Sequence, residues 1–360
     1  MSTSMRYATD DLVRSVSQLF ESSGLAFEDA RLVAEAFIEA DLLGFVTHGL
    51  NRVACNLDWL ERGETIAGRE PEVLVDRGAV VSWDAQQLPG PLVVARAVDL
   101  LCDRARQYGI ATMNLRRAQH IACLAAYLRR ATDRGLVIQI IASSPAERAV
   151  SAFGGSEPIF APNPFAFAVP TEEEPILIDM SLSIVAAGYV AKAKREGVLM
   201  DSECLKDSEG NPSDDPAVYS AEPPGSIMPI GGLDHGYKGY ALTLWSELMT
   251  MALGNYGRAD ELDESEENSV FIQVMDPDVY GSLGRFQREA QFLADMCRTS
   301  AVREGEPPVR VPGDRALALR RQQLEQGVIL SPHIMQDLFP WFEKFGVTAP
   351  TSLQSDQANQ

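Results

Sequence analysis

The sequence predicts an α/β protein of mixed α+β type with a helical N-terminal region. Two observations support this prediction. The first 65 or so residues contain only amphipathic helical patterns, in which apolar residues recur every three to four positions. From about residue 70, short apolar runs typical of strands alternate with amphipathic helices. With 360 residues, the chain is long enough for two domains.

Three helices are expected in the N-terminal region. The first spans about residues 9–23 and the second about residues 28–43, each with an apolar stripe along one side. The third is expected to begin at Thr47 and to end at Gly63. His48 would then lie just inside a helix start, where the partly positive helix end favours a neutral imidazole.

The next elements are expected to alternate between strand and helix. In chain order they are a strand at 79–83, a helix at 92–108, a strand at 110–115, a helix at 120–132 and a strand at 136–142. The last of these, LVIQIIA, is a nearly continuous apolar run, which is typical of a central strand covered on both faces. His120 would open the second helix of this series.

Residues 143–175 and 200–228 are rich in Pro, Gly and polar residues and are predicted to be loops. Between them, a strand at 176–180 ends with Asp179 and Met180. The segment Ser181–Leu182–Ser183 follows directly. A carboxylate and two hydroxyls at the end of a strand are well placed to contact a ligand.

A glycine-rich segment at 229–240 leads into a helix expected to end near residue 253. Glycines before a helix let the backbone approach a ligand, and Lys238 there is suited to a phosphate. A flexible loop before a packed helix is an equally good interpretation. The remaining expectations are a strand at 270–275, helices at about 283–299 and 314–326, a solvated acidic loop at 260–267 and a disordered tail at 350–360.

The composition excludes several classes of partner. The formal charge is −20, from 51 acidic and 31 basic residues, which disfavours nucleic acid and anionic membranes. No signal peptide or apolar run of membrane-spanning length is present. The five cysteines are scattered without a Cys-x-x-Cys pair, as in proteins of a reducing compartment. A cytoplasmic location is therefore expected.

The pair His48 and Arg52 is the first candidate for chemistry. Four positions apart on a helix, the two side chains would share one face. An imidazole exchanges protons near neutral pH, and a guanidinium binds a carboxylate through two parallel hydrogen bonds. A surface His-Arg pair without a function is the more common outcome of this spacing, so the pair alone does not establish an active site.

Other familiar signatures are missing from the sequence. There is no Gly-x-Gly, no Gly-Lys-Ser/Thr and no Gly-x-Ser-x-Gly, so Rossmann, P-loop and serine hydrolase motifs are all absent. The four histidines lie far apart in sequence, without the short spacing of a zinc site, and no metal is expected. From the residues alone, the conclusion is a protein of mixed α/β class with two interesting histidines, His48 and His120.

Several ordered blocks resemble the malate/L-lactate dehydrogenase family, which is distinct from the Rossmann lactate dehydrogenases. The resemblance extends over about residues 5–345, and relatives include ureidoglycolate, sulfolactate, 2,3-diketogulonate and piperideine-2-carboxylate oxidoreductases. The matching blocks are Ala40–Asp41–Leu42, His48–Gly49 with Arg52, Arg116 through His120, Asn163–Pro164, Leu177 through Ser183, Lys238–Gly239–Tyr240 and Pro312–Gly313–Asp314.

This resemblance implies hydride transfer between NAD or NADP and a 2-hydroxy/2-oxo acid, on a non-Rossmann fold, in a homodimer. It implies that His48 exchanges the proton, with His120 as the rival base, and that Arg52 and Thr47 bind a small carboxylate substrate. The implied cofactor contacts are Ser143, Ser144, Ile178, Asp179, Met180, Ser181, Leu182, Ser183, Ile184, Tyr237, Lys238, Pro312, Gly313 and Asp314. Residues 1–135, completed by about 306–345, would bind the substrate, and 136–305 would form the NAD(P)-binding domain.

The sequence also departs from the family pattern. Thr47 stands where many relatives have Ser, Pro162 stands where many have Thr, and Ile121–Ala122 replaces a usual Phe-Gly after His120. These changes bear on the substrate more than on the reaction class. Two alternatives therefore stay open: a reductase of a cyclic imino acid, and a dinucleotide-binding protein that has lost catalysis.

Overall fold

The computed structural model describes residues 4–260 and 267–353, and its mixed α/β fold confirms the predicted class. Its centre is a seven-stranded sheet in the order β2-β3-β4-β13-β5-β8-β9, antiparallel except between β3 and β4. The strands are β2 (Glu72–Asp76), β3 (Val80–Asp84), β4 (Ile110–Ala118), β5 (Val137–Ser143), β8 (Phe165–Val169), β9 (Ile176–Met180) and β13 (Asn268–Met275).

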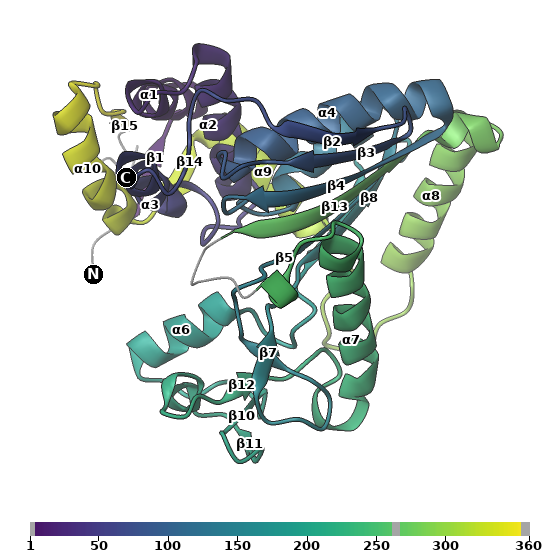
Figure 1. Cartoon of the computed structure of the whole chain (residues 1–360). Helices are drawn as coiled ribbons and strands as arrows, with labels where there is room; N and C mark the ends of the chain where they lie inside the picture. Colours follow the sequence, from purple (N-terminus) through teal and green to yellow (C-terminus); the bar gives the residue numbers. More distant parts are fainter. Residues whose placement is uncertain (1–3, 261–266, 354–360) are drawn as a thin grey trace, which may run out of the picture.

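Helices cover both faces of this sheet (Figure 1). On one face lie α4 (Gly90–Tyr108) and α5 (Ala125–Thr132). On the other lies α7 (Gly232–Glu247), which continues as a short π-helix (Leu248–Ala252). The prediction that residues 136–142 form a doubly covered strand is confirmed, because β5 lies inside the sheet and its isoleucines are almost completely buried.

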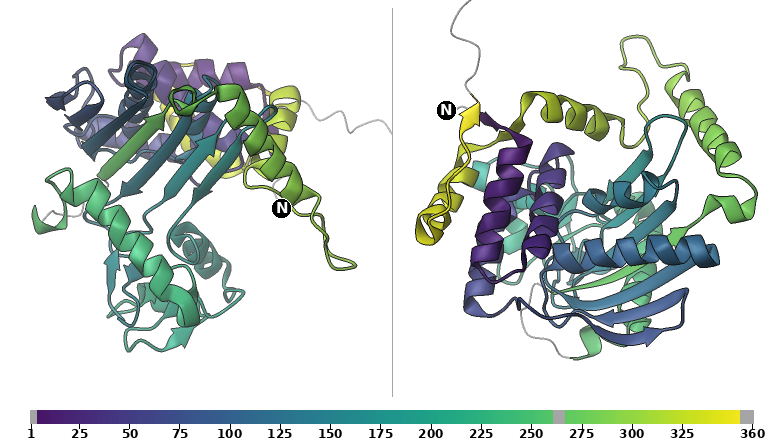
Figure 2. Two further views of the ribbon diagram at one scale, coloured as in Figure 1. Left: turned by 90° about the vertical axis from the view of Figure 1, so that its right-hand side faces the viewer. Right: turned by 90° about the horizontal axis from the view of Figure 1, so that it is seen from above.

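The N-terminal helices stand to one side of the sheet (Figure 2). They are α1 (Thr9–Ser22), α2 (Phe27–Leu42) and α3 (Val53–Arg62), joined by the C-terminal helix α10 (Pro332–Phe345) around a shared apolar core. A three-stranded sheet closes this region, with β1 (Met5–Tyr7) between β14 (Val328–Leu330) and β15 (Ser352–Leu353). The tail predicted to be disordered is thus paired at residues 352–353, and residues 354–360 lie outside the described part.

The segments predicted to be loops contain more structure than expected. A five-stranded sheet, ordered β11-β10-β12-β6-β7, packs with α6 (Ala187–Glu196) in the lower part of Figure 1. Its strands are β6 (Val150–Ser151), β7 (Pro158–Phe160), β10 (Leu205–Lys206), β11 (Pro212–Ser213) and β12 (Ser226–Ile227). The loop prediction was wrong here because two- and three-residue strands carry too few positions to show a period of two.

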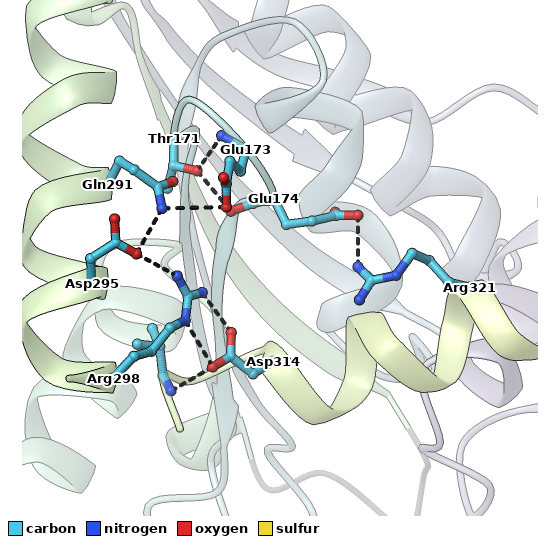
Figure 3. Close-up of polar contacts among 9 residues, drawn as sticks. Thr171, Glu173, Glu174, Gln291, Asp295, Arg298, Asp314 and Arg321 are labelled. Carbon is cyan, nitrogen blue, oxygen red and sulfur yellow. Dashed lines mark hydrogen bonds and ion pairs between the residues drawn. The ribbon is translucent and has the colours of Figure 1, made fainter. Parts of the chain in front are cut away.

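The last two long elements before β14 are α8 (Leu283–Arg298) and α9 (Asp314–Gln326), close to the predicted bounds. A polar cluster ties both to the turn between β8 and β9 (Figure 3). In it, the Arg298 guanidinium bridges Asp295 and Asp314, while Gln291 contacts Glu173. The acidic run predicted at 260–267 lies mostly outside the described residues.

Candidate active site

His48 lies in the loop that joins α2 to α3. The prediction of a helix starting at Thr47 is wrong: a turn occupies residues 46–49, a 3-10 turn follows (Leu50–Arg52), and α3 begins at Val53. The cause is local, because Gly49 adopts φ −93° and ψ −138°, which no helix allows. Arg52 still follows His48 closely, as the residue preceding α3.

A buried carboxyl holds this loop. Asp41, in the last turn of α2, accepts a hydrogen bond from the Leu50 N–H at 2.7 Å through Oδ2. The Gly49 backbone packs directly on this carboxyl, since a Cβ added at Gly49 would lie 2.4 Å from it. Burial raises the pKa of Asp41 to about 7, and its single backbone hydrogen bond offsets only part of that effect.

The fold brings His120 next to His48. The two rings are stacked, with centroids 5.8 Å apart and planes 21° apart. His120 does not open a helix as predicted, because α5 begins at Ala125 and the intervening Ala122 has φ +59°, which breaks a helix. The segment is held instead by the Asn268 side chain, which accepts the Ile121 N–H at 3.1 Å.

The two imidazoles have different partners at Nδ1. The Nδ1 of His120 accepts the Ala122 backbone N–H at 3.2 Å, so the neutral ring carries its proton on Nε2. The Nδ1 of His48 lies 2.8 Å from the Thr47 hydroxyl, which can either donate or accept. His48 can therefore gain and lose a proton without breaking this hydrogen bond, whereas His120 cannot.

Charge and burial keep both rings neutral. Burial, and then the Arg52 charge, lower the pKa of His48 to about 4. Burial, Arg52 and His48 together hold the pKa of His120 well below its usual value. The Arg52 guanidinium lies 5.3 Å from the centre of the Trp59 ring, which restricts its orientation. One cation beside two neutral imidazoles complements an anion that also carries a hydroxyl or carbonyl oxygen.

Two of the segments predicted to contact a cofactor lie side by side. The Ile230 N–H donates to Leu182 O at 3.0 Å, and Ser183 bridges to Pro229. Further along, a Cβ added at Gly232 would lie 3.2 Å from the Ile184 side chain. Residues 182–184 therefore lie beside the start of α7. The predicted Tyr237 and Lys238, further along α7, are exposed.

The end of β9 reaches the His120 segment, and the start of α6 reaches the His48 loop. The Asp179 carboxylate accepts the Ala125 N–H at 2.7 Å, directly after the His120 segment, and burial raises its pKa to about 6. A Cβ added at Gly188 in α6 would lie 3.9 Å from the Thr47 methyl group. Segment 179–188 thus contacts segments 47–52 and 120–125, and its residues 182–184 lie beside residues 229–232.

Several predicted contact residues use their side chains internally. Ser181 and Ser183 donate to the Ser183 and Val185 carbonyls, and Ser144 donates to Glu267 O. Ser143 is buried against Ser246 and Thr250. The exposed side chains of this set, available to a ligand, are Met180, Ile184, Tyr237, Lys238 and Pro312.

The turn Pro312–Gly313–Asp314 lies at the other end of β9. Pro312 O accepts the Leu177 N–H at 3.2 Å, and the Asp314 carboxylate binds Arg298 at 2.7 Å (Figure 3). These contacts connect β9 to α8 and α9. The predicted role of this turn in cofactor binding therefore stays a prediction.

A buried network connects the end of α7 to the loop after β5, and the sequence did not predict it. Glu247 binds Arg258 through both carboxylate oxygens, at 2.7 and 2.8 Å, and accepts Asn163 Nδ2 at 2.9 Å. Arg258 also donates to the carbonyls of the loop after β5. The only sequence signal was Asn163–Pro164 in the family blocks, because the pairing joins residues about 80 positions apart in the chain.

No other described feature offers a stronger site. A pocket of about 490 Å³ opens between α2, α5 and α9, and none of the predicted site residues lines it. Within residues 4–260 and 267–353, no group of three His, Cys, Asp or Glu side chains is placed to hold a metal ion. Over the same residues, no helix combines the length and apolar character that crossing a bilayer requires.

Known proteins resemble the chain over nearly its whole length. A (2R)-3-sulfolactate dehydrogenase (NADP(+)) of Chromohalobacter salexigens is 31% identical over 313 residues, 85% of this chain and 89% of that protein. Hydroxycarboxylate dehydrogenase B of Escherichia coli is 25% identical over 98% of this chain and 97% of that protein.

Solved structures share the fold. Malate dehydrogenase from Entamoeba histolytica superposes with a TM-score of 0.90 at 21% identity, covering 97% of this chain and all of that one. Delta1-piperideine-2-carboxylate reductase from Pseudomonas syringae pvar. tomato gives a TM-score of 0.82 at 27% identity, covering 93% of this chain and 99% of that one. The sequence profile of the malate/L-lactate dehydrogenases matches residues 7–339. The chain therefore belongs to the malate/L-lactate dehydrogenase family.

Proposed function

We propose that the protein is an NAD(P)-dependent oxidoreductase that transfers a hydride between nicotinamide and C2 of a 2-hydroxy/2-oxo acid. The observation that supports this most is the cluster of His48, His120 and Arg52, which places two neutral imidazoles beside one cation. Its relatives are dehydrogenases of hydroxy acids, one of them named for NADP+.

His48 is the group that moves the proton in this proposal. In the oxidative direction, its Nε2 takes the proton of the substrate hydroxyl, and the Thr47 oxygen accepts the Nδ1–H of the resulting imidazolium. His120 stays neutral, because a proton on its Nδ1 would face the Ala122 N–H. Its Nε2–H is left to donate to the same substrate oxygen.

Arg52 is proposed to bind the substrate carboxylate. Two parallel N–H···O bonds would fix which face of C2 is presented for hydride transfer. A bound carboxylate would also neutralise the Arg52 charge that lowers the pKa of His48. Substrate binding therefore makes His48 easier to protonate, as the reductive direction requires.

The residues present fit a dinucleotide along segments 178–184 and 229–238. The start of α7 offers Gly231 and Gly232, both at positive φ, so that a phosphate can approach the backbone, and Lys238 is exposed nearby. When bound there, the nicotinamide supplies or accepts the hydride. Lys238→Gln is expected to raise the Kd for NADPH by about fivefold, in a salt-dependent way. Lys344→Gln, in α10 and paired with Glu61, should change that Kd by less than about twofold.

The first experiment is a steady-state assay at 340 nm with NADH or NADPH and a panel of acceptors. Oxaloacetate, 3-sulfopyruvate and piperideine-2-carboxylate represent the relatives' named substrate types. We expect turnover on at least one acid and a loss of more than about a hundredfold in kcat for His48→Ala. Turnover within about twofold after that substitution would refute the proposal. NADPH binding without turnover on any acceptor would favour a binding protein that has lost catalysis.

A homodimer is part of the proposal. Helix α7, residues 248–253 directly after it and helix α8 expose large apolar side chains, which are typical of a subunit interface. They are Leu242, Leu244, Leu248, Leu253, Phe292, Leu293 and Met296. Light scattering after size exclusion should give twice the chain mass, and Phe292→Asp should give the monomer mass. A monomer in the unmodified protein would refute this assignment.

A cytoplasmic location is proposed on the chemistry of the cysteines. All five lie in the described part of the chain, and none forms a disulfide. Such cysteines are typical of a reducing compartment.

A further inference from the structure

We propose that Asp41 is a positioning residue for His48, whose carboxyl holds the loop of residues 45–50 in the conformation that sets the imidazole beside His120. This inference rests on the proposed role of His48 in proton exchange. In this inference Asp41 does not exchange the proton itself and acts through the loop.

The Asp41 carboxyl contacts the loop at two neighbouring residues. Oδ2 accepts the Leu50 N–H at 2.7 Å, and the carboxyl packs against the Gly49 backbone so closely that no Cβ fits there. His48 precedes Gly49 directly, and its own N–H donates to Phe45 O at 2.9 Å. The imidazole is therefore carried on a turn fixed at both ends, and Asp41 supplies one of the two fixed points.

The end of α2 does not depend on this carboxyl. Gln323 of α9 donates from Nε2 to Asp41 O at 2.8 Å and to Leu42 O at 3.1 Å, which satisfies the last carbonyls of the helix. Removing the carboxylate should therefore release the loop and leave the helix in place. This separation makes a positioning role distinguishable from a general structural one.

The placement is costly, which argues for a specific role. Asp41 is 1% exposed, and its Oδ1 has no hydrogen-bond partner among the described residues. A buried carboxyl with one unsatisfied oxygen destabilises the fold compared with an apolar residue of similar size. An apolar residue, however, would leave the Leu50 N–H buried without an acceptor and would not hold the turn.

The test compares Asp41→Ala with Asp41→Asn. Asparagine keeps the acceptor for the Leu50 N–H, so its kcat should stay within about threefold of the unmodified protein. Alanine removes the acceptor, and kcat should fall at least about tenfold, while the Kd for NADPH changes less than about twofold. If Asp41→Ala does not fold, Asp41→Ser, whose hydroxyl is too short to reach Leu50, takes its place.

Asp276→Ala is the matched control. Asp276 is also buried, and its carboxylate accepts a backbone N–H, that of Asp278 at 3.0 Å, but it lies at the far end of β13. It also pairs with Arg106 at 2.6 Å, so its loss should affect stability at least as much as the loss of Asp41. The substitution should lower thermal stability without lowering kcat. If Asp41→Ala behaves like this control, or if Asp41→Asn loses as much kcat as Asp41→Ala, the inference is overturned.

A wrong positioning role for Asp41 can be distinguished by experiment from a wrong proposed function. His48→Ala is measured in parallel with the same acceptor and NADPH. If His48→Ala abolishes turnover and Asp41→Ala does not reduce it, only the positioning role is wrong. If His48→Ala retains turnover, the proposed function itself is wrong. A direct readout is the His48 ring resonance, which should move in Asp41→Ala and stay in place in Asp276→Ala and Asp41→Asn.

Discussion

The charge of Arg52 should control the protonation of His48. We expect Arg52→Met, which removes the charge and keeps much of the side-chain volume, to raise the pKa of His48 from about 4. The value should stay below the ordinary 6.5, because burial is the larger cause and persists in the variant. Oxalate bound to the unmodified protein should raise the pKa of His48 in the same direction, by neutralising Arg52.

The size of the effect follows from the pKa. A shift from 6.5 to about 4 corresponds to about 3 kcal/mol in favour of the neutral ring. At pH 7, roughly one His48 in a thousand is then protonated in the free enzyme. The oxidative kcat/KM should therefore hold its plateau below pH 6 and decline only near pH 4, whereas the reductive reaction needs the carboxylate to be bound first.

The pH dependence of stability that His48 causes is opposite in sign to that of a salt-bridged histidine. The folded pKa of His48 lies below its unfolded value, so the unfolded chain binds more protons between pH 6.5 and about 4. The contribution of His48 to stability is thus fully present above pH 6.5 and is lost as the pH falls through this window.

Histidine resonances provide the assay, since the chain has only four histidines and single substitutions assign each one. Titration should give about 4 for the pKa of His48 in the unmodified protein and a higher value in Arg52→Met. Arg62→Met is the control, because Arg62 lies at the far end of α3 in pairs with Asp58 and Glu64. An ordinary pKa for His48 in the free protein, or an equal shift in the control, would refute this reasoning.

Three further substitutions test the scaffold, each by urea unfolding at pH 7. Glu247→Ala should lower the free energy of unfolding by about 3 kcal/mol, because it leaves the Arg258 charge uncompensated in a largely buried place; a loss below ~1 kcal/mol would contradict this. Gly313→Ala should cost more than about 1 kcal/mol, since φ is +99° and the new Cβ would lie 2.9 Å from Leu177 N; an unchanged midpoint would show that the turn can shift. Asn114→Ala should cost about 2 kcal/mol, because the Nδ2 of Asn114 donates to two carbonyls of the short π-helix, each at 3.0 Å. Asn114→Asp should not restore the lost stability, since a carboxylate cannot donate a hydrogen bond.

Much of the fold could be predicted because long amphipathic periods decide it locally. The helices α1, α2, α4, α8 and α9 and the strand β5 were predicted within a few residues of their bounds. The helix α6 buries only Val190 and Ala193, and α10 contains Pro340, so neither was predicted. The short strands of the five-stranded sheet gain their stability from pairing with distant segments, which no local window contains.

The candidate site, too, could be predicted from the sequence only in part. The Arg52 charge acts on His48, as the short spacing suggested, although the two residues do not share the predicted helix, because α3 begins only at Val53. The contact between His48 and His120 depends on the packing of two loops 72 positions apart, and only the family resemblance pointed to it. Asp41 fell within a matching block, but its role depends on a hydrogen bond to a backbone group, which leaves no mark in the sequence.

The sheet that joins β1 to β14 and β15 has a consequence for synthesis of the chain. The helices that flank the His48 loop, α2 and α3, are synthesised long before β14 and β15, the strands that close their region. We expect a nascent or prematurely terminated chain to keep this apolar core partly open, which makes it a target for chaperones and proteases. Removal of residues 328–353 should therefore disturb the His48 loop, although the removed segment begins 280 positions after His48 in the sequence.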